Sequence, residues 1–324
     1  MYCTPESLAS PMASIFTKSS SMVTATVEFS DQKRSPVLAV FIGVTAALIF
    51  GSADFAGGVA AKRISAVRVT AIGGLSGLVI LLLVFPLFPS VWSMKAVLLG
   101  GITGITGAFA VVLLYACLAI GPMSILSPLT AVISAVVPVI SGVLRGERLN
   151  ALGYVAIVVT LAAVVLVGFV PERGAIRPSL RALAMAVGAG ALIGVFLILI
   201  DLTPRDSGLV PLVVSRSVNA IVMFSAIGIG ALWARRRGTT SRSVGGWKPG
   251  LVLAIVAGAI DAIANALLLL GLRLGELTIQ SVLTALYPAG TILLAALVLR
   301  ERIAPVQIVG LVLALVAAAL LAVG

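Results

Sequence analysis

Apolar residues recur along the chain in long blocks that are separated by short polar connections. Each block has roughly 18–25 residues, the length at which an α-helix crosses a bilayer. A transmembrane β-barrel would instead alternate apolar and polar residues over segments of about 10 residues, and this alternation is absent. The pattern predicts an all-α polytopic membrane protein with ten transmembrane helices, at about residues 37–59, 66–88, 96–118, 123–144, 150–170, 182–202, 210–233, 249–271, 277–299 and 304–323.

The second part of the chain repeats the first. At a shift of 154 residues the matching positions include Glu147 with Glu301, Arg148 with Arg302, and the run 129–131 with the run 283–285. A weaker correspondence joins Gly51 to Gly194. We therefore divide the chain into two five-helix repeats, residues 36–170 and 171–324. The Ser- and Thr-rich segment 1–35 has no apolar run of signal-peptide length, and we expect it to be a disordered tail.

An odd number of helices in each repeat has a topological consequence. The second repeat enters the membrane from the opposite side, so the two repeats are inverted with respect to each other. Inverted repeats place a substrate site near the bilayer midplane between the halves and support alternating access. The pattern therefore predicts a transporter.

The composition of the chain argues against several classes of function. The chain is 60% hydrophobic and 10% charged, with a net charge of +11. The Lys and Arg side chains lie in short connections, where they set topology beside lipid headgroups, so we expect no nucleic-acid partner. The two cysteines and the absence of histidine indicate neither a disulfide framework nor a metal site. Without a phosphate-binding Gly-rich loop as well, the sequence predicts no cofactor and no enzymatic activity.

Several short motifs carry a resemblance to a known family. They are residues 51–58 in the first predicted helix, 119–124 before the fourth, Gly146-Glu147-Arg148 after the fourth, 261–265 in the eighth, and Leu286-Tyr287-Pro288 leading to Arg300-Glu301-Arg302 after the ninth. Together they make the chain resemble an EamA-type member of the drug/metabolite transporter superfamily. The second Gly-Glu-Arg element departs from the pattern, because Arg300 replaces the glycine.

The resemblance implies a secondary transporter, with export of small metabolites favoured, in the bacterial cytoplasmic membrane. It also implies that both termini face the cytoplasm. The positive-inside rule favours the opposite orientation, because more Lys and Arg fall on the side away from the termini. Uncoupled facilitation, flipping of a lipid intermediate, and a non-transporting scaffold or sensor subunit are the alternative functions.

Charged residues inside predicted membrane helices are costly and are functional candidates by default. Asp261 lies near the centre of the eighth predicted helix, and Asn265 lies on the same helix face four residues later. We predict that both bind substrate and that Asp261 also takes part in ion coupling. Asp54, followed by two glycines that could loosen the end of the first helix, is a second candidate for both roles.

Other polar residues complete the predicted site. Arg216 is a candidate ligand for an anionic group, and a structural ion pair with Asp201 is the alternative interpretation. Tyr287 and Ser281 are expected to add polar contacts to the substrate. Glu147 and Glu301 are expected to form ion pairs that shape the loops.

The expected partners are a small-molecule substrate and the lipid bilayer. Small residues let membrane helices pack closely, and the chain has five Gly-x-x-x-Gly matches, beginning at Gly73, Gly100, Gly142, Gly190 and Gly271. Packing within the chain is the simpler explanation for them. A dimer contact through one of them is the alternative, so the sequence is compatible with a monomer or a homodimer.

Overall fold

A computed structural model describes residues 36–121, 123–168, 178–236, 247–298 and 304–323. All regular secondary structure in these ranges is helical. The predicted tail, Arg237 and Arg242 between the predicted seventh and eighth helices, and the second Glu-Arg element with Glu301 lie outside the described residues. The helices are α2 (Pro36–Ala61), α3 (Ala66–Val84), η1 (Phe85–Leu87), α4 (Met94–Ile120), α5 (Met123–Leu144), α6 (Ala151–Gly168), α7 (Leu180–Asp201), η2 (Arg205–Ser207), α8 (Val210–Arg236), α9 (Lys248–Leu274), α10 (Leu277–Thr284), α11 (Tyr287–Val298) and α12 (Pro305–Val323).

The helices agree with an all-helical membrane protein. Within the described ranges, seven helices are long and apolar enough to cross a membrane, namely α2, α3, α4, α5, α7, α8 and α9. Helices α6 and α12 are apolar but shorter. The predicted ninth span is divided between two helices. The all-helical, multi-pass organisation is thus confirmed, whereas the count of ten continuous spans remains a prediction.

The division of the ninth span corrects the continuous helix predicted at 277–299. Helix α10 ends at Thr284 and α11 begins at Tyr287. Pro288 has no backbone N–H, so it cannot continue the hydrogen-bond ladder to the carbonyl of Thr284, but it fits the first turn of a new helix. A short turn at Ala285 and Leu286 therefore separates the two helices, close to the middle of the predicted span.

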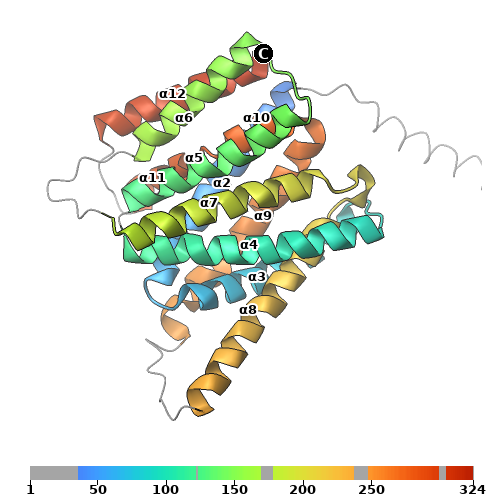
Figure 1. The fold of residues 1–324 in the computed structure, drawn as a ribbon, viewed down its shortest axis with the longest axis vertical. Helices are drawn as coiled ribbons and strands as arrows, with labels where there is room; N and C mark the ends of the chain where they lie inside the picture. The colour runs from blue at the N-terminus through green and yellow to red at the C-terminus, as the bar shows by residue number, and fades with distance from the viewer. Residues whose placement is uncertain (1–35, 122, 169–177, 237–246, 299–303, 324) are drawn as a thin grey trace, which may run out of the picture. The chain divides into compact units, whose positions relative to one another are not determined.

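The two repeats exchange their first helices. Helix α2 packs against α9, α10 and α11, whereas α7, the corresponding helix of the second repeat, packs against α4 and α5. The last helices of the repeats, α6 and α12, lie side by side (Figure 1). Each repeat therefore supplies the partner of the other's first helix, and neither has a closed core of its own.

Glycines make this exchange possible at equivalent places. A Cβ at Gly51 would lie 2.6 Å from the backbone nitrogen of Thr291, and a Cβ at Gly194 would lie 2.7 Å from Cβ of Val137. Thr291 and Val137 are themselves related by the shift of 154 residues. The weak sequence correspondence between Gly51 and Gly194 therefore reflects the same helix contact in both repeats.

The Gly-x-x-x-Gly matches face neighbouring helices of the same chain. Gly73 and Gly77 of α3 lie against Gly258 of α9. Gly100 and Gly104 lie against α8, Gly190 and Gly194 against α5, Gly142 against Thr278, and Gly271 against Gln280. Packing within the chain therefore involves at least one glycine of each match.

Candidate functional site

A central cavity of about 90 Å³ lies among helices of both repeats. Its walls are mainly apolar, but they carry three ionisable side chains. Asp54 comes from the first repeat, and Arg216 and Asp261 come from the second. The remaining lining residues are Phe50, Gly107, Ala110, Val111, Leu114, Ser134, Ile193, Phe196, Leu197, Ser215, Asn219, Asn265, Leu268, Thr284 and Tyr287.

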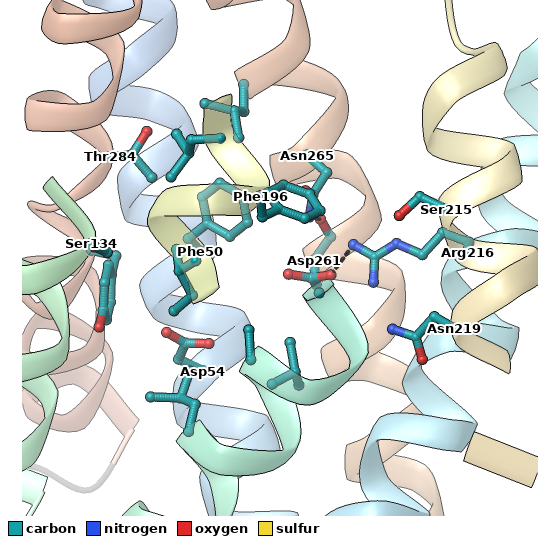
Figure 2. Close-up of a pocket in the computed structure, with 18 residues that line it drawn as sticks. Phe50, Asp54, Ser134, Phe196, Ser215, Arg216, Asn219, Asp261, Asn265 and Thr284 are labelled. Carbon is teal, nitrogen blue, oxygen red and sulfur yellow. Dashed lines mark hydrogen bonds and ion pairs between the residues drawn. The ribbon is translucent and has the colours of Figure 1, made fainter. Parts of the chain in front are cut away.

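Arg216 of α8 and Asp261 of α9 form an ion pair in the wall of this cavity (Figure 2). The guanidinium is buried, and the side chain of Asp261 is 20% exposed. The predicted pair between Arg216 and Asp201 is therefore wrong. Asp201 lies at the end of α7, where its Oδ2 accepts a hydrogen bond of 2.9 Å from Nη1 of Arg145. The helix that faces Arg216 is α9 rather than α7.

Asn265 supports the backbone of Asp261. Its Nδ2 donates a hydrogen bond of 2.8 Å to the carbonyl oxygen of Asp261, one turn earlier on α9. The two side chains share the face of α9 that lines the cavity, as the four-residue spacing predicts. The amide oxygen of Asn265 is left for a further donor.

Asp54 lines the cavity from α2 and has no counter-ion. Figure 2 shows its carboxylate at the cavity, away from the Arg216–Asp261 pair. No hydrogen bond or ion pair joins it to another residue in the described parts of the chain. The expected loosening of the helix after Asp54 does not occur, because α2 continues to Ala61. Gly57 instead gives room to the phenol of Tyr115, which would collide with any side chain there.

The structure brings Tyr287 to the cavity but not Ser281. The hydroxyl of Tyr287 donates a hydrogen bond of 3.2 Å to the carbonyl oxygen of Ser127, which connects α11 to α5. Ser281 is buried in α10, where its hydroxyl donates to the carbonyl oxygen of Thr278 at 2.9 Å. Ser281 does not line the cavity, so its predicted contact with substrate is not supported.

Sequence reasoning missed Asn219. It lies three residues after Arg216, on the same face of α8, and lines the cavity beside it. That spacing is the signal that would have found it, because an amide one turn from a buried arginine shares its surroundings. Ser134 and Ser215 also line the cavity, but serines are too common in membrane helices to single them out.

Within the described residues, Glu147 forms no ion pair. Its carboxylate accepts hydrogen bonds from the backbone nitrogens of Leu277 at 3.2 Å and Thr278 at 3.0 Å, and from the hydroxyl of Thr278. These groups lie in the first turn of α10, where backbone N–H groups have no hydrogen-bond partner inside the helix. Glu147 of the first repeat thus caps a helix of the second. The positive φ of 90° at Gly146 turns the chain just before it.

No group of three or more Asp, Glu, Cys or His side chains comes together in the part of the chain that the structure describes.

The comparison with known families agrees with this arrangement. The model of the EamA-like transporter family matches the chain twice, over residues 37–169 and 180–323. The chain belongs to the EamA-like transporter family. Its members are membrane transporters of the drug/metabolite type rather than enzymes, so this EamA protein is a multi-pass membrane transporter built from two repeats.

The fold recurs among solved structures. One crystal structure superposes on this EamA chain with a TM-score of 0.65 and 18% sequence identity, and the match covers 87% of this chain and 95% of the other. At this identity the match establishes a shared fold and carries no information about substrate. No curated protein matches the chain.

Proposed function

We propose that this EamA protein is a secondary active exporter of small metabolites that works by alternating access about the central cavity. The observation that carries the proposal is a charged cavity between the repeats, with Asp54 supplied by one repeat and the Arg216–Asp261 pair by the other. A rocking movement of one repeat against the other would change the spacing of these groups. A site at such an interface is the arrangement that inverted-repeat transporters use.

We assign substrate binding to the charged and polar side chains of the cavity. Arg216 and Asp261 offer a cation and an anion side by side, and Asn265, Tyr287 and Asp54 surround the same space. Apolar side chains such as Phe50 and Phe196 would hold the body of the substrate. A volume of about 90 Å³ favours a small solute over a lipid chain in this conformation.

We assign ion coupling to Asp54 first and to Asp261 second. Protonation of Asp261 would leave the buried Arg216 without its counter-ion, which is strongly unfavourable inside a protein. Asp54 has no ion pair to lose, so it can gain or release a proton at lower cost. A carboxylate that exchanges a proton inside the membrane is a recurrent element of coupled transport.

Metabolite profiling of cells and medium tests the proposal. The cells would carry the wild-type chain, the Asp54→Asn variant, the Asp206→Asn variant or an empty vector. We expect wild type and Asp206→Asn, which changes an exposed carboxylate of η2, to shift the same metabolite into the medium. We expect Asp54→Asn to lose this shift.

A proton uncoupler separates the mechanisms. Wild-type export that continues unchanged in the uncoupler would support facilitation and exclude proton coupling. No flux from purified protein in vesicles, together with a stable co-purifying subunit, would support the scaffold alternative.

A further inference from the structure

A second cavity of about 20 Å³ lies against the Arg216–Asp261 pair. It extends between α3 and α9, where Thr70, Gly73 and Gly258 line it. Four residues line both cavities and therefore stand between them, namely Val111, Arg216, Asn219 and Asp261. The ion pair therefore borders both cavities.

Asn219 has an unused acceptor at this place. The residue is 4% exposed, and no group in the described residues donates a hydrogen bond to its Oδ1. Gly74 of α3 makes room for the amide, since a Cβ there would lie 3.0 Å from this oxygen. A buried carbonyl oxygen without a donor is unfavourable, because it has lost its hydrogen bonds to water. The oxygen therefore indicates a ligand that carries an O–H or N–H group.

The size and lining of the small cavity fit one molecule of water. A buried water needs a space of about 10–15 Å³ and two to four polar partners. Besides Asn219, the residues that line it include Asp261, Thr70 and Tyr115. A metal cation is disfavoured, because the guanidinium of Arg216 is part of the same wall.

We propose that the small cavity is a binding site for a single water molecule, anchored on Oδ1 of Asn219. The water hydrates the Arg216–Asp261 pair from the small cavity. The water site itself does not depend on the proposed transport function.

The water site would allow Arg216 to separate from Asp261. Separating two buried charges is costly when neither finds a new partner. Arg216 carries five N–H donors, and both the water and the Asn219 amide, one turn away on α8, can accept from them. The guanidinium can then leave Asp261 while it stays hydrogen-bonded. This role in the transport cycle, unlike the water itself, rests on the proposed function.

Radiolytic hydroxyl labelling of the purified full-length protein tests the site, because it modifies reactive side chains that touch bound water. Tyr115 lines the small cavity and Tyr287 lines the central one, and they are 6% and 4% exposed. We expect both to be labelled in wild type. Asn219→Leu should abolish labelling of Tyr115 and leave that of Tyr287 unchanged.

Asn265→Leu is the matched control, since this amide lines only the central cavity, and it should leave Tyr115 labelled. Absence of label on Tyr115 in wild type would overturn the water site, and full labelling in Asn219→Leu would remove Asn219 as its anchor. If Asn219→Leu does not fold, Gly74→Ala replaces it, with the same loss expected. Labelling needs no substrate, so a chain that fails to transport still gives a clear result.

Discussion

Arg216 and Asp261 are opposite charges held together within a bundle of mostly apolar helices. Each depends on the other, because either charge alone would lie in a mostly apolar surrounding without a counter-ion. The pair also borders the space in which we place the substrate, so its stabilising role and its binding role fall on the same atoms. These roles can be separated by removing one charge and then both.

Asp261→Asn is expected to destabilise the protein by about 3–5 kcal/mol, because it leaves Arg216 uncompensated. The double variant Arg216→Met with Asp261→Asn should recover most of this loss, since no unpaired charge remains. Equilibrium unfolding in mixed micelles measures both. A double variant as unstable as the single one would show that the pair is not the source of the loss.

The sequence predicted which residues line the site better than it predicted which of them interact. Asp54, Arg216 and Asp261 were candidates because an ionisable side chain inside a membrane helix is energetically costly. The structure places all three at one cavity. The partner of Arg216 could not be predicted, since it depends on which helices face each other. Asn219 was missed for a related reason: a neutral amide in a membrane helix gives a weaker signal than a charge.

At the scale of helices, the contact between α2 and α11 depends on a missing side chain. Gly51 lies directly on the backbone of α11, near Gly290 and Thr291, and the hydroxyl of Thr291 donates to the carbonyl oxygen of Gly51 at 3.1 Å. Backbone atoms cannot rotate away as a flexible side chain would. The approach of the two helices is therefore specific to glycine.

Gly51→Ala is expected to destabilise the protein by about 1–3 kcal/mol, the usual cost of an extra methyl group in a packed interior. Gly101→Ala is the control, because a Cβ at Gly101 would meet nothing within 4 Å. Thermal unfolding of the purified variants in detergent should show a lower midpoint for Gly51→Ala alone. Equal midpoints would mean that α11 can move to admit the methyl group.

The helices themselves follow largely from the apolar pattern, and their ends fall near the polar connections. The break between α10 and α11 was harder to predict. Pro288 indicated a disturbance, but a proline in a membrane helix more often kinks it than divides it. The separation at Ala285 and Leu286 depends on the neighbouring helices that accept the two halves, which the local sequence does not contain.

At the scale of the whole molecule, the two repeats contact each other both through their helices and through a loop. The first helices are exchanged, and Glu147 joins the loop after α5 to the first turn of α10. A shift of 154 residues detects the repeat but gives no sign of this exchange. Only the packing of complete helices decides that α2 lies with the second repeat.

Glu147→Ala is expected to cost about 0.5–2 kcal/mol, the range found when a helix cap is removed. Limited proteolysis would then cut the chain near Leu277 and Thr278 faster than in wild type. Arg148→Ala, which changes the exposed neighbour of Glu147, should leave the cutting rate unchanged. Unchanged cutting in Glu147→Ala would mean that α10 is held by its side-chain packing alone.

The position of Glu147 also bears on the order in which the protein is made. The ribosome synthesises the first repeat before the second. The carboxylate of Glu147 is therefore already part of the membrane-bound chain when α10 is synthesised. The first turn of α10 can then find its acceptor as soon as it is inserted. If a rearranged gene encoded the second repeat first, α10 would be synthesised before Glu147. The backbone N–H groups of Leu277 and Thr278 would then have no acceptor until the first repeat was inserted.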